Sequence, residues 1–581
     1  MNSLVARGRM LLTAALVVVA APVWAQTTGI PEDIKAVIRA RVDTGVSMSI
    51  VVGVVDASGT QYFGYGQLAD GDPRTPDEHT VYEIGSISKA FTGVLLADMV
   101  ERGEVRLDDP ITRFLPEGVR APTRNGKVIR LVDLATHSSG LPRMPSNFAP
   151  ADAANPYADY TVEQMYEFLN GVTLQRDIGA QYEYSNYGMG LLGQLLANRA
   201  GMSYEALMVE RIAGPRDLAD TRVEFTVPMR SRLALGHNMG IAVANWDIPA
   251  LAGAGAIRST AADMLTFIAA NMGLVETPLL PAMRASHAAR VGTGRTDMQV
   301  ALAWHVRQGQ GGPTIWHNGG TGGYRTFTGF REDGSRGVVV LTNSSPDGAD
   351  DIGFHLLDSS FALATVRPSV AIPVHRTLAS QGVAMARARY RDLREQATDA
   401  YDYGEPALNT LGYLYLQNQG DTETAIELFR LNVEMFPGSA NAYDSLGEAF
   451  MLAGETDSAV AYYQTSLALN PANTNARERI REMGAEPNVP AAVEVTRALL
   501  DAYAGTYERQ PGVELRVWRD GDRLMGQVTG QPAVTLTAIA ETRFAVDGIA
   551  AQLAFGRDDV GGVTEVVIYQ NATQTVWRRI D

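Results

Sequence analysis

A serine and a lysine stand three residues apart at the start of an apolar helix pattern. Ser86 and Lys89 follow a strand pattern at 80–84 and precede the apolar residues 90–95. At this spacing the hydroxyl and the amine lie on one helical face, one turn apart. A serine becomes a nucleophile when a nearby base takes its proton, and a lysine is such a base once burial lowers its pKa. The pair predicts acyl transfer through Ser86, with Lys89 as the base.

The use of basic residues singles out this lysine. The chain has 49 basic residues, and only Lys35, Lys89 and Lys127 among them are lysines. Arginine does not lose its proton in proteins, whereas lysine does so when it is buried. A chain that uses arginine almost everywhere therefore keeps a deprotonatable amine beside Ser86, which favours a catalytic interpretation over a chance pairing.

A second polar segment, Tyr184-Ser185-Asn186, precedes another apolar helix pattern. A phenol beside a lysine ammonium would have a lowered pKa, so Tyr184 is expected to move a proton between Ser86 and the leaving group. The Asn186 amide is expected to bond both Lys89 and a substrate carbonyl. The alternative interpretation is structural, because Ser185 and Asn186 are also good helix caps.

A third segment, His317-Asn318-Gly319-Gly320, ends a predicted strand. Glycines there would let a substrate lie against the strand edge as an added strand. The backbone amides of Ser86 and Gly320 would form an oxyanion hole for a tetrahedral intermediate. The residues expected to bind substrate are therefore Asn186, His317, Gly319 and Gly320.

The net charge and the spacing of possible metal ligands bear on which cofactors and partners to expect. The sequence has no cluster of residues at metal-ligand spacing, so neither a metal nor an organic cofactor is expected. The formal net charge of -16 repels phosphate backbones, and a nucleic-acid partner is not expected. A carboxylate on the substrate would face Arg325 or Arg143.

Strand patterns at both ends of the first domain enclose a helical middle section, which includes apolar-periodic segments at 94–100 and 191–197. A closing helix is predicted at 354–364. Strands are predicted at 47–55, 62–66, 301–306, 314–317, 325–330 and 337–341. This arrangement predicts an α+β domain with one antiparallel sheet that both ends of the domain complete.

In this order, Ser-x-x-Lys, Tyr-x-Asn and a His-x-Gly strand resemble the active site of the serine β-lactamase and penicillin-binding superfamily. That superfamily includes class C β-lactamases, D,D-peptidases and esterase-like serine hydrolases. Segments 107–110, 134–142 and 255–263 also look like its recurring structural segments. The resemblance covers about residues 30–365 and implies a β-lactamase/D,D-peptidase-like antiparallel sheet flanked by helices.

The resemblance also implies a substrate class. A Tyr-Ser-Asn element with His317 in place of a lysine is similar to soluble D,D-peptidases, D-amino-acid amidases and certain esterases. Class C β-lactamases usually carry a glutamine at the position of Met144. We therefore expect a serine hydrolase that cleaves an amide or ester bond of a peptide or small molecule through a Ser86 acyl-enzyme.

Two alternatives remain. One is a β-lactamase that hydrolyses β-lactam antibiotics. The other is an inert penicillin-binding-fold scaffold that acts through helical repeats in the second half of the chain. The complete set of candidate residues argues against the scaffold, because a chain without catalytic selection would have lost at least one of them.

The second half of the chain contains a repeat of about 34 residues. Leu411-Gly412 recurs as Leu446-Gly447, and Pro437 recurs as Pro471. This period resembles tetratricopeptide repeats, which form an all-α domain whose concave face is a candidate docking surface for a protein partner. The helix pattern at 383–396 is expected to pack on the first repeat. Short strand patterns near the C-terminus resemble a small lipocalin-like antiparallel β domain.

The predicted boundaries follow from these patterns and from prolines at 368, 373, 487 and 490. They are a signal peptide at 1–25, the hydrolase-like domain at 26–367, the repeats at 376–485 and the β domain at 495–581. The signal peptide rests on Arg7 and Arg9, an apolar run and the cleavage pattern Val23-Trp24-Ala25. It predicts a periplasmic or secreted protein with no stable membrane span after cleavage. The absence of cysteines excludes disulfides.

Overall fold

The computed structural model describes residues 29–345, 348–397, 399–489, 493–510, 513–528, 533–546, 551–558, 561–570 and 573–581. The predicted signal peptide at 1–25 lies outside these residues. Within the described ranges, no helix combines the length and the apolar character needed to cross a membrane.

An eight-stranded antiparallel sheet joins the two ends of the first domain. Its strand order is β2-β1-β14-β13-β12-β11-β10-β9. β1 (Ser49–Asp56) pairs with β14 (Gly337–Thr342), so the N-terminal hairpin of β1 and β2 (Gly59–Gly66) completes a sheet formed by later strands. Those strands are β9 (Val291–Gly292), β10 (Met298–Val300), β11 (His305–Arg307), β12 (Thr314–Gly320) and β13 (Arg325–Arg331). The predicted α+β sheet is confirmed.

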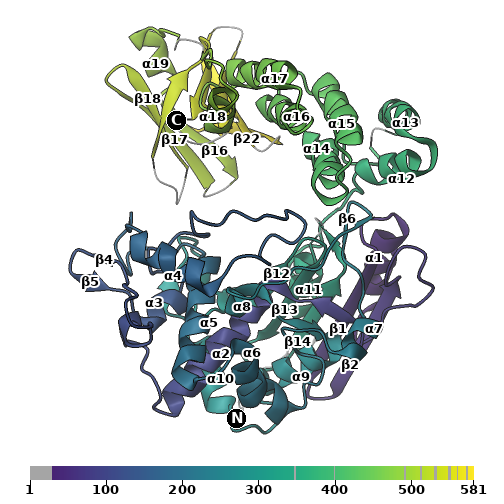
Figure 1. Cartoon of the computed structure of the whole chain (residues 1–581), viewed down its shortest axis with the longest axis vertical. Helices are drawn as coiled ribbons and strands as arrows, with labels where there is room; N and C mark the ends of the chain where they lie inside the picture. Colours follow the sequence, from purple (N-terminus) through teal and green to yellow (C-terminus); the bar gives the residue numbers. More distant parts are fainter. Residues whose placement is uncertain are drawn as a thin grey trace, which may run out of the picture.

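Helices cover both faces of this sheet (Figure 1). Val52 of β1 packs in one apolar cluster with α1 (Glu32–Asp43) and α11 (Asp350–Leu357). The preceding residue, Val51, lies on the opposite face of the sheet and packs in the main core with α9 (Ala261–Met272). Because both faces are buried, β1 and β14 are rich in valine rather than alternately apolar and polar.

The long helix α2 (Ser88–Glu101) occupies the centre of the domain. Its residues from Ser88 to Met99 are all buried. It packs against α5 (Asn186–Ala200), α8 (Ala252–Gly255) and α10 (Leu280–His287). The short pair β3 (Val81–Glu83) and β8 (Arg258–Thr260) leads into it. The remaining helices of the domain are α3 (Leu131–Ala135), α4 (Val162–Gly171), α6 (Tyr204–Met208) and α7 (Val227–Ser231).

The strand predicted at 301–306 is wrong for residues 301–304, and only its last two residues lie in a strand, β11. The chain reverses there between β10 and β11, and Ala303 has a left-handed φ of 65°. The apolar run packs as a turn against the helices: Ala303 N donates to Ala135 O at 2.8 Å. A Cβ on Gly93 of α2 would lie 2.1 Å from the carbonyl oxygen of Leu302, so the turn sits directly on the helix backbone. Periodicity alone does not distinguish such a buried turn from a strand.

The closing helix predicted at 354–364 is also misplaced. α11 begins earlier, at Asp350, and ends at Leu357. Asp358 ends it by forming an Asx turn, in which its carboxylate accepts from Ser360 N at 3.0 Å and from Ser360 Oγ at 2.6 Å.

Helical hairpins follow and form an arc toward the C-terminal domain (Figure 1). In each repeat, the glycine of the recurring Leu-Gly pair packs against the ring of the recurring aromatic residue. A Cβ on Gly412 would lie 2.5 Å from the ring of Phe429, and a Cβ on Gly447 would lie 3.0 Å from the ring of Tyr463. The helices are α12 (Ala371–Gln381), α13 (Val383–Gln396), α14 (Glu405–Tyr413), α15 (Thr422–Met435), α16 (Ala440–Leu452), α17 (Thr456–Leu469) and α18 (Thr474–Glu482).

The first two of these helices precede the repeats. Pro373, predicted to lie in a linker, sits in the first turn of α12, where a missing N–H breaks no helical hydrogen bond. α13 packs on α15 as expected, and an ion pair joins Arg387 to Glu427.

The C-terminal domain is a closed antiparallel barrel with its own apolar core, preceded by α19 (Arg497–Tyr503). Tyr503, Tyr507 and Phe555 are among the aromatic side chains in that core. The barrel confirms the predicted small antiparallel β domain. Its strands are β16 (Gly505–Gln510), β17 (Val513–Asp520), β18 (Arg523–Val528), β19 (Val534–Ala538), β20 (Arg543–Val546), β21 (Ala551–Arg557), β22 (Val563–Gln570) and β23 (Thr573–Arg579).

Candidate active site

Ser86 lies in a single turn of 3-10 helix, η1 (Gly85–Ile87), between β3 and α2. Of the residues from Thr80 to Met99, Ser86 alone is not buried. Gly85 has a φ of 51°, and a Cβ there would lie 2.7 Å from the backbone nitrogen of Gly320. The fold therefore presents one hydroxyl from an otherwise buried segment, directly beside the end of β12.

Lys89 is completely buried one turn after Ser86. Its Nζ lies 2.9 Å from Ser86 Oγ and donates to Ala254 O at 2.6 Å. Burial, and secondly the charge of Arg143, lower the pKa of Lys89 well below its usual value. In the neutral form its lone pair can take the Ser86 proton. The contact with Ala254 was not predicted, because α8 is distant in sequence.

Tyr184 contacts both members of this pair. Its hydroxyl is hydrogen-bonded to the Ser86 side chain, and its ring centroid lies 4.8 Å from Lys89 Nζ. Burial raises the pKa of Tyr184 above its usual value, so the expected lowering is wrong. The reason is that a phenolate would lose its hydration in this buried position, and the charge of Arg143 offsets this loss only in small part. Tyr184 is therefore a protonated phenol that can donate its proton.

Asn186 is the first residue of α5, and the cap of this helix is Ser185, whose Oγ accepts from Gly188 N at 2.8 Å. Asn186 Nδ2 contacts Met144 Sδ at 3.9 Å. Its Oδ1 is buried and has no partner among the residues that the structure describes. The expected bond to Lys89 is not formed in this state. The open amide oxygen suits a substrate N–H instead.

β12 brings His317, Gly319 and Gly320 to the site. His317 is fully buried, and its Nδ1 donates to Asn318 O at 2.6 Å, which leaves Nε2 as an acceptor without a partner in the described part of the chain. Its ring centroid lies 6.3 Å from that of Tyr184. Gly319 passes so close to the residue after β3 that a Cβ would lie 1.9 Å from Ile84 O. Gly320 itself is exposed.

Two further histidines surround Tyr184. Ser185 N donates to His137 Nδ1 at 3.1 Å, and the rings of His137 and Tyr184 are 4.6 Å apart. His305 Nε2 lies 3.2 Å from the hydroxyl of Tyr182. Burial lowers the pKa of His305 to about 4 and that of His137 well below its usual value, so both rings are neutral at pH 7. Neither residue was predicted, because each comes from a separate element and carries no spacing signal.

The two candidate arginines differ in what they face. Arg325 Nη1 donates to Thr321 O at 2.9 Å and Tyr324 O at 2.8 Å. Arg143 is exposed, and its guanidinium lies 5.2 Å from the ring centroid of Tyr184. The described residues contain no ion pair with Arg143. They also contain no group of three or more side chains arranged to hold a metal ion.

A hydroxyl, a buried amine with a lowered pKa, a protonated phenol and a glycine-rich strand edge thus meet at one point. This combination can activate an oxygen nucleophile, stabilise an oxyanion and protonate a leaving group. Fold and site together define the class of serine hydrolases that act through an acyl-enzyme.

Comparison with known proteins agrees with this class. A family model described as Beta-lactamase matches residues 34–358, and one described as Tetratricopeptide repeat matches residues 442–477. The D-alanyl-D-alanine-carboxypeptidase/endopeptidase AmpH of Escherichia coli (strain K12) is 29% identical over 323 residues, which are 52% of this chain and 82% of that protein. A β-lactamase of the same strain is 26% identical over 360 residues, covering 55% of this chain and 91% of that protein.

Among solved structures, a β-lactamase/D-alanine carboxypeptidase from Yersinia pestis complexed with citrate is 21% identical, with a TM-score of 0.49. The match covers 57% of this chain and 98% of that chain. Because the family model matches more than half of the 581 residues, the chain belongs to the β-lactamase family. It is a serine hydrolase of the D,D-peptidase/β-lactamase type that also carries a tetratricopeptide repeat.

Proposed function

We propose that this protein hydrolyses a peptide amide bond through an acyl-enzyme on Ser86. The observation that carries this proposal is the contact of 2.9 Å between Ser86 Oγ and the buried Nζ of Lys89. A lysine amine is kept completely buried at a cost in solvation free energy, and its neutral form is the base that the neighbouring serine needs.

The proposed reaction follows from the contacts. Lys89 takes the proton of Ser86 as the serine oxygen attacks the substrate carbonyl, and the amides of Ser86 and Gly320 hold the resulting oxyanion. Tyr184 gives its proton to the leaving amine, and the lysine proton restores the phenol. Water then attacks the ester, the same groups move its proton to Ser86, and the carboxylic acid product leaves. His317 and Asn186 position the substrate.

Arg143 points to the chemistry of the leaving group. Since Tyr184 is the proposed donor to the leaving amine, a cation beside the Tyr184 ring lies on the leaving-group side of the scissile bond. An amino acid with a free carboxylate is a leaving group that this guanidinium can pair with. A relative is named as a D-alanyl-D-alanine-carboxypeptidase/endopeptidase, and we propose a peptide ending in D-alanine as the substrate class.

A β-lactam is the second candidate substrate, because another relative is named a β-lactamase. The observation against efficient turnover is Met144, whose sulfur contacts Asn186 at the position where class C β-lactamases usually carry a glutamine. The N-terminal signal pattern further supports a periplasmic or secreted location. The repeats remain a candidate docking surface for a protein partner.

Matched peptides test this proposal. Peptides ending in D-Ala-D-Ala, with a free carboxylate or with a C-terminal amide, are compared for wild type and Arg143→Gln. Wild type should prefer the free carboxylate, and the variant should lose roughly tenfold of that preference, the value of a charge-assisted hydrogen bond. Arg230→Gln is the control, since Arg230 in α7 also lies over a ring at 5.1 Å, but that ring is Phe225 and not Tyr184. Equal hydrolysis of both peptides by wild type would overturn the carboxylate role.

A further inference from the structure

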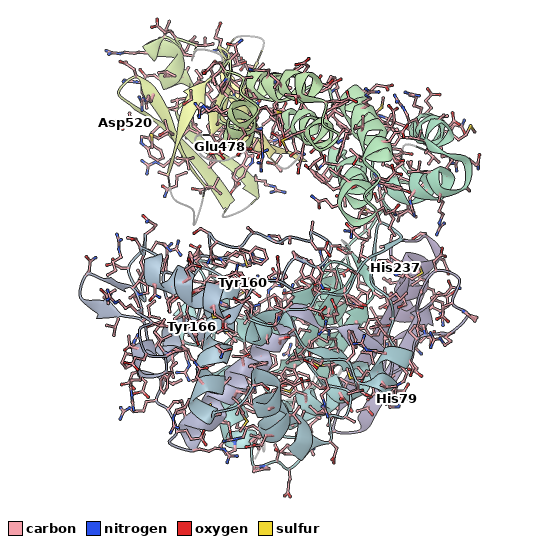
Figure 2. The ribbon with its side chains drawn as sticks, viewed as in Figure 1. His79, Tyr160, Tyr166, His237, Glu478 and Asp520 are labelled. Carbon is pink, nitrogen blue, oxygen red and sulfur yellow. The ribbon has the colours of Figure 1, made fainter. Side chains whose placement is uncertain are left out.

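A small hairpin of the catalytic domain reaches into the helical repeats. It consists of β6 (His237–Asn238) and β7 (Ile241–Ala242), joined by Met239 and Gly240 with left-handed φ values of 51° and 78°. Two consecutive left-handed residues form the tight turn that matches the twist of a two-stranded hairpin. Figure 2 labels His237 where the catalytic domain meets the repeats.

The tip of this hairpin belongs to the core of the repeats. Met239 and Ile241 are 7% and 5% exposed, and they share one apolar cluster with residues of α12 and α14. The partners in that cluster include Val370, Ala371, Val374, Leu408 and Leu411. Burial of two large apolar side chains against another domain is a contact that holds the hairpin in place.

The base of the hairpin encloses the loop that follows β12. His237 N donates to Gly323 O at 3.3 Å and to Asn343 O at 2.9 Å. A Cβ on Gly323 would lie 2.6 Å from the Cα of Gly236, so the two backbones are in direct contact. On the other side, the hydroxyl of Tyr324 donates to Ala234 O at 2.7 Å and accepts from Asn245 Nδ2 at 2.9 Å.

This loop sets the direction of the Gly320 amide. Gly320 pairs with Arg325 at the end of β12 and β13, and Thr321 N donates to Tyr324 O at 3.1 Å to close the turn between them. Residues 321–324 are therefore fixed by the strands on one side and by the hairpin on the other. The amide at their start is the second donor of the proposed oxyanion hole.

We infer that the helical repeats form part of the support of the active site, and that Met239 and Ile241 are positioning residues for the Gly320 amide. The inference rests on the proposed role of that amide. An oxyanion hole stabilises the transition state only when its donors lie at hydrogen-bond distance from the developing negative oxygen. Loss of the anchor should therefore slow acylation while substrate binding changes little.

The test uses full-length variants and an activated ester. Met239→Ala/Ile241→Ala should lower kcat roughly tenfold or more with KM changed less than twofold, because only transition-state stabilisation is lost. Met239→Leu should keep the wild-type kcat, since it refills the same apolar site. Leu446→Ala is the control, because it removes a buried side chain from the same repeat core in α16, away from the hairpin. It should keep the wild-type kcat as well.

Hydrogen exchange of the hairpin amides shows whether the anchor is released. A wild-type kcat in the double variant, together with faster exchange in residues 237–243, would overturn the inference. An equal loss in Leu446→Ala would also overturn it, because general weakening of the repeats would then explain the effect. If the double variant fails to fold, the same comparison of kcat, KM and hydrogen exchange is made with Met239→Ala alone. Failure of the proposed function would differ, since wild type itself would then form no acyl-enzyme.

Discussion

Lys89, as the proposed base, sets the pH range in which Ser86 is expected to react. The proposed acylation needs the neutral amine, and burial lowers the pKa of Lys89 well below its usual value. At pH values above this lowered pKa the base is already free. Burial raises the pKa of Tyr184, so the phenol keeps its proton at alkaline pH. The two shifts act in opposite directions and widen the range in which both groups have the required form.

The acylation rate should therefore level off with rising pH at a pH well below about 10.4, the usual pKa of lysine. A lysine with its usual pKa would instead give a rate that rises about tenfold per pH unit from pH 7 to 9, because the neutral fraction rises by that factor. The acylation rate should decrease as the pH falls through the lowered pKa of Lys89, because the amine then becomes protonated. Pre-steady-state acylation by a neutral activated ester measures the profile. A tenfold rise per unit from pH 7 to 9 would contradict the assignment of Lys89.

At the residue scale, part of the site was predictable from the sequence. Ser86 and Lys89 lie one turn apart where η1 continues into α2, so their spacing alone predicts their contact. His137, His305 and Arg143 come from three other elements, and only the folded chain brings them to Tyr184. The direction of the Tyr184 pKa shift was not predictable either, because it depends on how deeply the fold buries the phenol.

At the element scale, close backbone contact between β12 and η1 brings together the two amides of the proposed oxyanion hole. Gly319 lies against Ile84 O, and Gly85 lies against the amide of Gly320, with no room for a Cβ at either position. Thr326 Oγ1 also donates to Ile84 O at 3.0 Å, which ties β13 to the same point. The strand edge and the nucleophile therefore move as one unit.

Gly319→Ala should separate these elements. A Cβ 1.9 Å from Ile84 O forces a backbone shift, and overpacking of this kind costs about 1–3 kcal/mol of unfolding free energy. We also expect kcat to fall at least roughly tenfold, since the Gly320 amide moves with the strand. Gly292→Ala is the matched control, because nothing lies within 4 Å of its added Cβ on the edge strand β9. Unfolding in urea and ester hydrolysis measure both effects, and a wild-type kcat in Gly319→Ala would contradict this account.

Most elements around the site were predictable because strand and helix periods are local properties. The exceptions have a common physical cause. Residues 301–304 form a turn because α2 and α3 contact their backbone, and α11 ends at Leu357 because the Asp358 carboxylate completes a turn there. Both depend on contacts that a period in the sequence does not encode.

At the scale of the whole molecule, the described residues form five apolar clusters: two in the catalytic domain, two in the helical region and one in the barrel. The catalytic core and the core of the repeats meet at the hairpin of β6 and β7, which contributes Met239 and Ile241 to the repeats. The barrel core shares no residue with either of them. The 34-residue period made the repeats predictable. The insertion of the hairpin was not, because Met239 and its partners lie more than 100 residues apart.

The barrel should accordingly unfold as a separate unit. Calorimetry of the full chain is expected to show more than one transition, because the cores do not overlap. A covalent acyl group on Ser86 should raise the unfolding temperature of the catalytic domain and leave that of the barrel unchanged. The reason is that a bound group stabilises only the unit that holds it. A single transition that shifts as a whole after acylation would contradict independent cores.

The role of Ser86 is most directly tested by the intact mass of the protein after incubation with a penicillin, with Ser86→Ala measured beside wild type. We predict a mass increase of one penicilloyl group on wild type and none on Ser86→Ala, because the ring-opened lactam stays attached to the serine oxygen. The same adduct on Ser86→Ala, or wild type that consumes the penicillin while Ser86→Ala consumes it equally fast, would contradict the assignment of Ser86 as the nucleophile.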